Sequence, residues 1–574
     1  MLPQGDRAGL ELDWPGQKIA PLCFSCGVAL YSLTSLSEMA KVAEEGLSLL
    51  EKKECSVIKA NLLNLQARCY EFSDPGRYLS LIFESAGVLD SAENLSGLAI
   101  DEVLWIAETC AVRRMRQEEE RWYGVARRVA ETTGDVGMQS CLSMSLGAYK
   151  LFRGDIEGAV ELTEKSIQQA IRAGDAWKIA WGKVLHGWCY ELRGDFEKSL
   201  ALSRQAFEAA SRLEAHMPNG RVYAAYALRN CATALLGLGR REEALDDLSR
   251  VLALYRQFAQ EGFPGSRGFL ELPILAKELQ AAGMRKEGAG VLEQFFGREP
   301  HLMLSWESEF CAYWPVLAMA LSVKEEAMDD PAGFREFCRE YRGRYPHAGD
   351  PAFRQWHLEL SQPRDFDRNE SEGRFDERLL GDWSWVDPLG DCSFETANGL
   401  VIRAANCRDL WFLNASAPRL VRSMSGDFSL QVSCENALQD RPGLGGIVIW
   451  QDQDTYLYLE HGILGPCDLT FRGCDGARPH VFGRGRLAAG KVWLRVERTG
   501  RQVRALCSAD GAQWHTLGEV QVPFNEEILA GVFASGHIDR TWYHGAYTEG
   551  AAIRFESYAI LRPDKVRAPH GTGT

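Results

Sequence analysis

The sequence has little of what a membrane, secreted or nucleic-acid-binding protein needs. Asp and Glu (79) outnumber Lys and Arg (64), and the net charge of −15 argues against a dedicated binder of nucleic acid or anionic membranes. Residues 1–7 lack the basic and then apolar pattern of a signal peptide, and the most apolar early run, 19–33, is broken by Pro21 and Gly27. The 16 cysteines are scattered at irregular spacing, which favours reduced thiols. We therefore expect a cytoplasmic protein with no nucleic-acid and no membrane partner.

Motifs of common enzyme active sites are also missing. The sequence contains no phosphate-binding Gly-x-x-x-x-Gly-Lys-Ser/Thr loop, no Gly-x-Ser-x-Gly elbow, no kinase catalytic loop and no His-Glu-x-x-His. Cys23 and Cys26 have the spacing of a zinc-binding or redox pair, but no second ligand pair follows at a finger-like distance. We interpret these two cysteines as small apolar residues packed in a helix. We expect no catalytic residue, no metal and no cofactor.

A repeated helical pattern organises the first half of this 574-residue chain, which is too long for a single core. Residues 146–159 and 186–199 are near copies of one pattern of helix, Gly-Asp turn and helix. Gly154 and Gly194 are 194 − 154 = 40 residues apart. A fixed period of this size predicts stacked helical hairpins, because one hairpin cannot bury its apolar face alone. The two Arg-Gly-Asp triplets at these glycines then lie on inter-helix turns, which we prefer to an adhesion motif.

These segments resemble tetratricopeptide repeats, with small residues in the first helix and Ala-Val or Ala-Leu in the second, as at 159–160 and 244–245. The period grows to 239 − 194 = 45 between later turn glycines, which is similar to the longer repeats of bacterial multidomain regulators. In those regulators the repeats follow an ATPase or kinase module. The resemblance implies a helical repeat domain over 25–344, after a leader of residues 1–24. It also implies another protein as partner on the concave face of the repeats.

Beyond residue 344 the pattern changes from helices to short strands. Turn residues at 346 and 349–351 and the polar run 362–377 predict a linker over 345–378. Alternating apolar runs separated by turn residues then predict an antiparallel sandwich. The expected strands are 400–404, 428–434, 446–450, 455–460, 492–497, 503–508, 528–534 and 553–558, with hairpin tips at 452–454 and 509–511.

Four motifs in this half resemble, in order, an uncharacterised bacterial family with a concanavalin-A-like β-sandwich of the regulation-of-enolase type. They are Ala-Pro-Arg-Leu (417–420), Ser-Gly-Asp-Phe (425–428), Leu-Arg-Val-Glu-Arg-Thr-Gly (494–500) and Ser-Ala-Asp-Gly-Ala-Gln-Trp (508–514). The resemblance implies a sandwich over 379–563 and a disordered tail over 564–574. It implies no activity, since related sandwiches are glucanases, lectins and accessory domains. The expected fold class is therefore multidomain α plus all-β: an α-solenoid of helical hairpins followed by an antiparallel jelly-roll β-sandwich.

The sandwich also carries the candidate ligand-binding residues. Aromatic side chains with a few charged partners suit sugar stacking and hydroxyl binding, and Glu460 and Glu497 are expected to share one concave face because alternate strand residues point the same way. The candidates are Asp409, Trp411, Arg419, Tyr456, Tyr458, Glu460, Trp493, Arg495 and Glu497. The alternative is that these residues form a solvated sheet face or a surface docked on the repeats. Asp452 and Asp454 are interpreted as a hairpin turn, with a metal-binding pair as the alternative.

We therefore expect a non-enzymatic protein–protein interaction scaffold with a C-terminal module that recognises a ligand or partner. A glycan or a small ligand is the candidate partner of the sandwich, and bacterial signalling or regulation is the expected setting. One alternative is the regulatory portion of a larger kinase- or ATPase-type signalling protein. A second alternative is a carbohydrate-active enzyme that uses the sandwich, although the sequence lacks the Glu-x-Asp-x-x-Glu or Glu-x-Asp-x-Glu strand of retaining glucanases of this fold.

Overall fold

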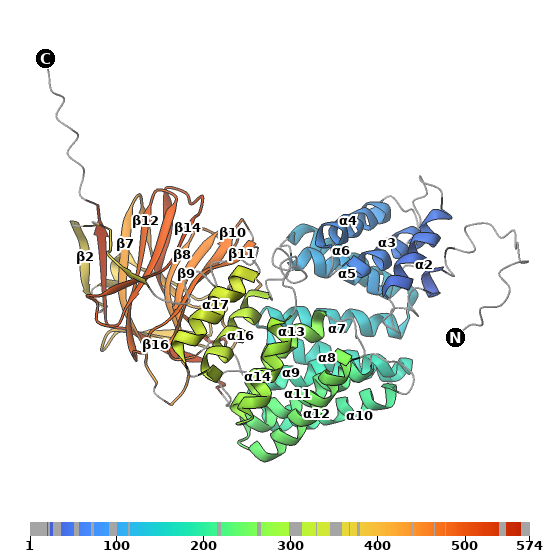
Figure 1. The fold of residues 1–574 in the computed structure, drawn as a ribbon. Helices are drawn as coiled ribbons and strands as arrows, with labels where there is room; N and C mark the ends of the chain where they lie inside the picture. The colour runs from blue at the N-terminus through green and yellow to red at the C-terminus, as the bar shows by residue number, and fades with distance from the viewer. Residues whose placement is uncertain are drawn as a thin grey trace, which may run out of the picture.

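The computed structural model contains a helical domain followed by a β-sandwich, as the sequence predicts (Figure 1). It describes residues 20, 23–26, 36–50, 57–70, 74–90, 100–112, 115–214, 220–260, 266–297, 313–328, 330–344, 359–364, 366, 368–375, 379–411, 413–438, 440–463, 465–476, 478–538 and 547–563. The predicted leader and tail lie almost wholly outside the described residues.

The first half consists of helices. They are α2 (Leu36–Ser48), α3 (Val57–Tyr70), α4 (Pro75–Asp90), α5 (Ile100–Val112), α6 (Arg116–Thr133), α7 (Val136–Phe152), α8 (Ile156–Ala173), α9 (Ala176–Leu192), α10 (Phe196–Glu214), α11 (Gly220–Gly237), α12 (Arg241–Gln260), α13 (Ser266–Ala281), α14 (Arg285–Phe296), α16 (Tyr313–Met328) and α17 (Pro331–Arg344). Within the described ranges, none of these helices has the length and apolar character needed to cross a membrane.

The turns of the repeat follow from their Gly-Asp pairs. Gly154 (φ +79°) and Gly194 (φ +76°) take the left-handed conformation that ends the first helix of a hairpin. The next residue, Asp155, then accepts a hydrogen bond from the backbone N–H of Gly158 at 2.9 Å, which satisfies a free donor at the start of α8. Close packing within the hairpin depends on Gly147, where an added Cβ would lie 2.9 Å from Thr163 Cγ2. The predicted Gly-Asp turns at Gly154 and Gly194 are confirmed.

The second half consists of two antiparallel sheets. Their strands are β1 (Glu359–Ser361), β2 (Arg368–Arg374), β3 (Ser384–Val386), β4 (Ser393–Glu395), β5 (Leu400–Ala404), β6 (Arg419–Ser425), β7 (Phe428–Asn436), β8 (Leu444–Trp450), β9 (Tyr456–His461), β10 (Asp468–Asp475), β11 (Arg478–Arg486), β12 (Lys491–Thr499), β13 (Gln502–Ser508), β14 (Trp514–Gln521), β15 (Glu527–Ser535), β16 (Ala551–Phe555) and β17 (Ser557–Arg562). A short 3-10 helix, η2 (Leu379–Asp382), precedes β3.

The two sheets pack face to face around one hydrophobic core. The ten-stranded sheet has the order β1-β14-β13-β12-β7-β16-β5-β4, with β17 paired to β2 and β7, and the seven-stranded sheet has the order β11-β10-β9-β8-β15-β6-β3. The core between them is built from alternate residues of both sheets, for example Leu459, Phe471, Val432 and Leu494.

The predicted linker over 345–378 is wrong for part of its length. Strand β1 pairs with β14, and β2 pairs with β17, so both belong to the ten-stranded sheet. Their sequences, Glu-Leu-Ser and Arg-Asn-Glu-Ser-Glu-Gly-Arg, are polar and carry almost no apolar alternation. The sequence signal for a strand is absent there because these strands gain their stability from pairing at the sheet, not from apolar side chains.

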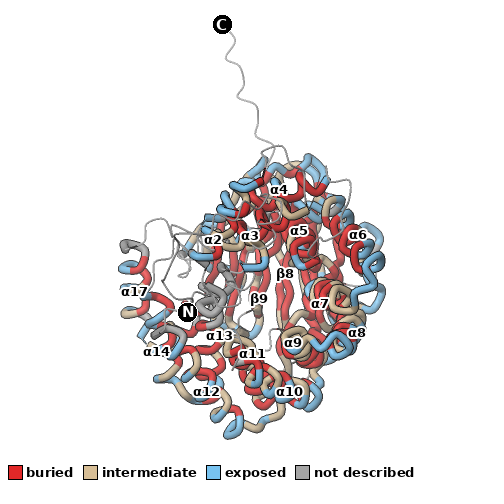
Figure 2. Tube along the Cα trace, turned by 90° about the vertical axis from the view of Figure 1, so that its right-hand side faces the viewer, coloured by how far each residue is buried: buried red, intermediate tan, exposed pale blue. Residues whose placement is uncertain are grey.

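The helical array is curved and its first helices line the inner side. Successive first helices contact each other, α5 with α7, α7 with α9, α9 with α11 and α11 with α13. Figure 2 shows them on the inside of the curve, with α8, α10 and α12 outside, and with β8 and β9 of the sandwich behind the centre. The turns at one edge of the array lie toward the sandwich, since the carbonyls of Gly154 and Leu192 accept hydrogen bonds from Arg408 and Asn406.

Candidate functional site

The candidate residues on strands fall on two opposite faces of the sandwich. Leu457 and Leu459 of β9 belong to the core, so the alternate residues of β9, including Glu460, point outward from the seven-stranded sheet. Leu494 and Val496 of β12 belong to the same core, so Glu497 points outward from the ten-stranded sheet. The expectation that Glu460 and Glu497 share a concave face is wrong, because the core separates them. The alternation of apolar and polar residues predicts which side chains of a strand point outward, but it does not predict which of the two sheets the strand belongs to.

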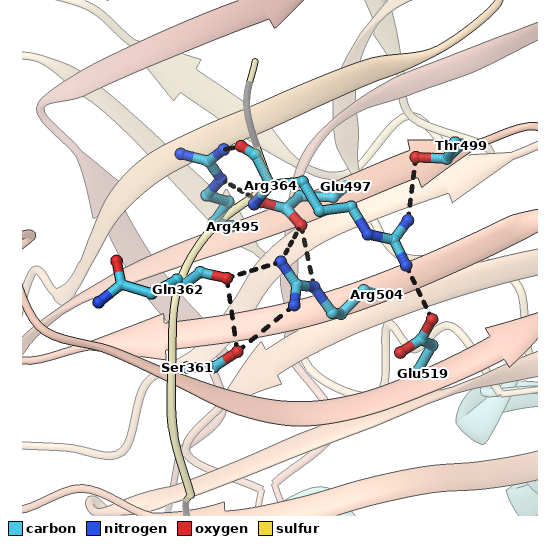
Figure 3. Close-up of polar contacts among 8 residues, drawn as sticks. All are labelled: Ser361, Gln362, Arg364, Arg495, Glu497, Thr499, Arg504 and Glu519. Atoms are coloured by element: carbon cyan, nitrogen blue, oxygen red, sulfur yellow. Dashed lines mark hydrogen bonds and ion pairs between the residues drawn. The ribbon is translucent and has the colours of Figure 1, made fainter. Parts of the chain in front are cut away.

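On the ten-stranded sheet, Glu497 lies at the centre of a closed ion cluster (Figure 3). Its carboxylate accepts hydrogen bonds from Arg495 Nε at 2.9 Å, from Arg504 Nη2 at 2.6 Å and from the backbone N–H of Arg364 at 3.0 Å. The Glu497 side chain is fully buried, and Arg495 and Arg504 are only 7% and 13% exposed. All strong acceptor positions of the carboxylate point at protein donors, which is the arrangement of a structural cluster.

The cover over this cluster is the segment 359–364. Figure 3 shows it crossing the strands above Glu497. Its carbonyls at Gln362 and Arg364 accept hydrogen bonds from Arg504 Nη2 (3.0 Å) and Arg495 Nη2 (3.3 Å). The third candidate on this face, Trp493, is partly buried, with its ring near Gly511. Two of the three candidates on β12, Arg495 and Glu497, thus hold the segment 359–364, which we call the strap.

On the seven-stranded sheet, Glu460 forms a buried ion pair with a residue that the sequence interpretation missed. Arg472 of β10 lies with Nε 2.6 Å from Glu460 Oε1, and the side chains are 14% and 1% exposed. No well-directed hydrogen bond from the described residues reaches either carboxylate oxygen. Burial raises the pKa of Glu460, Arg472 opposes that rise, and the nearby Asp409 adds to it. The polar and apolar alternation of 468–475 could have indicated this strand and the outward direction of Arg472.

Three of the candidates, Arg419, Tyr456 and Tyr458, form a group of aromatic and cationic side chains beside this pair. Tyr456 stacks between Trp450 (centroids 4.9 Å apart) and Tyr458 (5.9 Å). Arg419 lies over the Trp450 ring at 4.2 Å, and burial lowers the pKa of Arg419 to about 10. Arg472 lies over the Tyr458 ring at 4.9 Å. Aromatic faces that would stack on a sugar are therefore engaged by neighbouring side chains of the protein.

The loop before β6 closes over this group. Leu410 and Ala417 are buried against Tyr456 and Tyr458, and Trp411 packs at the edge of the same cluster. The carboxylate of Asp409 accepts hydrogen bonds from the backbone N–H of Leu410 (2.8 Å) and from Ser535 Oγ (3.4 Å). The structure thus brings the six candidates of this face together, but the loop before β6 covers the surface that they form.

The two acidic groups that resemble metal sites are engaged in contacts with their own loops. Asp452 Oδ1 accepts from the backbone N–H groups of Asp454 and Thr455, both at 2.8 Å, so it performs the predicted turn role. Asp387, Asp391 and Cys392 have ligand atoms within 4.8 Å of one another. However, Asp387 accepts from the N–H of Cys392 at 2.8 Å and Asp391 is paired with Arg408 at 2.6 Å. These contacts assign both groups to loop structure.

A further surface, for which the sequence interpretation named no residues, lies on the first helices of the repeats. Trp177 and Trp181 of α9 meet Tyr223 of α11, with ring centroids 6.0 and 5.5 Å apart, and Trp181 also lies 6.1 Å from Tyr226. All four rings are half-buried, and Lys178 Nζ lies 5.9 Å from the Trp177 centroid. We call these four rings the aromatic row. Their spacing of three and four residues was visible in the sequence, but it fits core packing equally well.

Comparison with known proteins finds structural similarity at low identity. No protein-family model and no curated protein matches the chain. The helical part is similar to a Rap protein complexed with competence and sporulation factor, at 12% identity and a TM-score of 0.39, over 58% of this chain and 94% of that chain.

The sandwich is similar to the GH43 protein BlXynB from Bacillus licheniformis, at 18% identity and a TM-score of 0.29, over 33% of this chain. That match spans only 39% of the BlXynB chain. It is also similar to the carbohydrate-binding module CBM66 from Bacillus subtilis, at 12% identity and a TM-score of 0.23, over 31% of this chain and 95% of that chain. These low values leave the function to be argued from the chain's own residues.

Proposed function

We propose that this protein is a non-enzymatic scaffold that binds another protein on the inner side of its helical repeats. The observation that carries the proposal is the aromatic row, Trp177, Trp181, Tyr223 and Tyr226, on neighbouring first helices. Half-buried Trp and Tyr residues give large contact area at low cost in side-chain entropy, and they dominate the energetics of many protein interfaces. Stacked repeats present such residues along an extended surface.

The arrangement of the sandwich supports the non-enzymatic part of the proposal. A glycosidase of either stereochemical class needs two carboxyl groups on one sugar-sized site, about 5 to 10 Å apart. Glu460 and Glu497 lie on opposite sides of a core about 10 Å thick. Each is buried against arginines, so neither is placed to protonate a leaving group or attack a sugar. A sandwich that braces the repeats fits these contacts better than a free sugar-binding module.

The test is capture of the partner by the full chain and by two matched variants. Trp181→Ala removes the ring that contacts both Tyr223 and Tyr226, whereas Ile171→Ala removes an apolar side chain that is 58% exposed on the outer helix α8. We expect the wild type and Ile171→Ala to retain the same partner and Trp181→Ala to lose it by about tenfold or more, as for an interface anchor worth about 1.4 kcal/mol or more.

Equal retention by both variants would place the partner elsewhere on the molecule. A wild-type chain that retains no partner above background would count against the scaffold. Incubation with a panel of β-glucans checks the enzymatic alternative independently, since the appearance of reducing ends would contradict the non-enzymatic assignment.

A further inference from the structure

The sandwich holds the helical repeats through a short loop, residues 405–411, which we call the docking loop. Asn406 Nδ2 donates a hydrogen bond to the carbonyl of Leu192 at the end of α9 (2.5 Å). Arg408 Nη1 donates to the carbonyl of Gly154 in the turn after α7 (3.2 Å). Between these two contacts, Cys407 is buried in an apolar cluster with residues of α7, α8 and α9. The docking loop therefore contacts the turns of two successive repeats.

The fit at Gly154 is tight and specific to that turn. A Cβ added to Gly154 would lie 2.6 Å from the Cys407 carbonyl oxygen and 2.7 Å from Asn414 Nδ2. Gly239, at the corresponding turn of a later hairpin, has nearly the same backbone (φ +73° against +79°), but an added Cβ there meets nothing within 4 Å. The absence of a side chain at Gly154 thus serves the domain contact as well as the turn.

The docking loop is held in the shape that makes this contact. Cys407 has φ +60°, the single positive φ outside glycine among the residues that the structure describes, and such a conformation is strained for a side-chain-bearing residue. Its N–H donates to the carbonyl of Gly536 (3.1 Å). Arg408 is oriented by Asp391, with Nη2 2.6 Å from Oδ2. Contacts within the sandwich hold this strained conformation, so the loop is preorganised for its contact with the repeats.

A second contact between the domains includes an ion pair. Figure 1 shows α16 next to the edge formed by β10 and β11. There Arg486 Nη1 lies 3.2 Å from Glu325, and Arg486 Nε lies 3.5 Å from Asp468. Val481 packs against the apolar core of the last helices. Relative motion is the ordinary expectation for domains within one chain unless their interface is large and apolar.

We propose that the docking loop is a releasable latch: it holds the sandwich on the turns of two successive repeats in the state seen here, and its release separates the two domains at this contact. The proposal does not depend on the scaffold function, because it concerns the contact between the two domains. The two-point contact at Gly154 and Leu192 is the part that opens. The apolar cluster that Cys407 forms with Leu151, Ile156 and Cys189 is the surface that opening exposes.

Native-state thiol labelling of the full chain tests this proposal. Cys189 and Cys407 are buried at the latch, Cys474 lies on the covered sheet face, and Cys434 and Cys507 lie in the sandwich core. N-ethylmaleimide reacts with thiols only when they are exposed, and mass spectrometry gives the rate at each cysteine. In the wild type we expect the latch thiols to react while Cys474 and the two core thiols stay protected. Reaction of all five at one common rate would overturn the proposal.

Two variants with a matched control sharpen the result. Gly154→Ala introduces the clash with the docking loop, and Arg408→Ala removes the hydrogen bond to Gly154 without changing a turn. Each should raise the labelling rates of Cys189 and Cys407 by about tenfold, as expected for the loss of roughly one buried hydrogen bond. Gly239→Ala carries a similar backbone strain and should leave these rates unchanged relative to other thiols.

Equal rates in Gly154→Ala and Gly239→Ala would show that the loop does not hold the domains, and the proposal would fail. Acceleration of Cys434 and Cys507 together with the latch thiols would show unfolding in place of release, and this too would overturn it.

Discussion

Removal of the Glu497 charge should strongly destabilise the sandwich, because the side chain is fully buried between two arginines. Glu497→Gln keeps the size of the side chain but leaves Arg495 and Arg504 buried without a counter-ion. It also replaces one of two acceptor oxygens by a donor that faces the N–H of Arg364 or a guanidinium. The strap 359–364 is tied to the same arginines, so its register should loosen as well.

The magnitude follows from burial. Removing one partner of a buried ion pair typically costs about 3 to 5 kcal/mol, because the remaining charge loses its compensation. A surface ion pair contributes about 1 kcal/mol or less. The matched control is therefore Glu519→Gln, since Glu519 pairs with Arg364 at 2.8 Å but the two side chains are 36% and 27% exposed. A difference of about 2 to 4 kcal/mol between the variants is expected, a large share of a typical domain stability of about 5 to 15 kcal/mol.

The measurement is guanidinium-induced unfolding of the sandwich, followed by the labelling of its core thiols Cys434 and Cys507. These thiols report on this domain alone, which avoids treating a two-domain chain as a two-state system. Backbone hydrogen exchange at Arg364 gives a second, local reading. If Glu497→Gln and Glu519→Gln unfold at the same denaturant concentration, the cluster is open to water and the assignment of the strap as its cover is wrong.

Two further predictions concern packing and pH. Gly147→Ala should destabilise the α7–α8 hairpin by about 1 to 3 kcal/mol, because the added methyl meets Thr163 at 2.9 Å. Gly290→Ala in α14 meets nothing within 4 Å and should stabilise its helix by about 0.5 to 1 kcal/mol. Unfolding followed by helical circular dichroism compares the two variants, and a change in stability of the same sign in both would refute the argument. Burial lowers the pKa of His461 from 6.5 to about 4. Between these pH values the unfolded chain binds a proton at His461 and the folded chain does not, so the free energy of unfolding should fall by about 3 kcal/mol as pH drops from about 6.5 to about 4. His461→Gln should flatten that slope in unfolding curves recorded across this range, and an unchanged slope would contradict the buried neutral form.

Much of the helical domain could be predicted because its signals are local. The left-handed glycine and the capping aspartate act within a few residues, so the turns at Gly154 and Gly194 follow from the Gly-Asp pair itself. The close approach at Gly147 follows from the small residue on one face of α7. Strands of the sandwich core were predicted for the same reason, since their alternation of apolar residues is contained in each segment.

The candidate site was predictable only in part, because its geometry depends on which strands share a sheet. The sequence interpretation selected Tyr456, Tyr458 and Glu460 as one outward face of a strand, and they do share it. It could not show that Arg472 supplies the counter-charge, since that contact arises from the pairing of β9 with β10. Nor could it show that the polar segment 359–364 seals Glu497, because the two are 133 residues apart along the chain at the closest contact.

The sequence by itself determined the repeat, its turns, the two-domain order and the outward direction of the polar strand residues, because hydrogen bonding and side-chain alternation act over a few residues. Only the tertiary structure decided that Glu460 and Glu497 lie on opposite faces and that both are covered. It also decided that an Arg-Gly-Asp turn is a docking point, since Arg408 reaches Gly154 across 408 − 154 = 254 residues. Such contacts depend on how whole domains meet, and no local pattern in the chain encodes them.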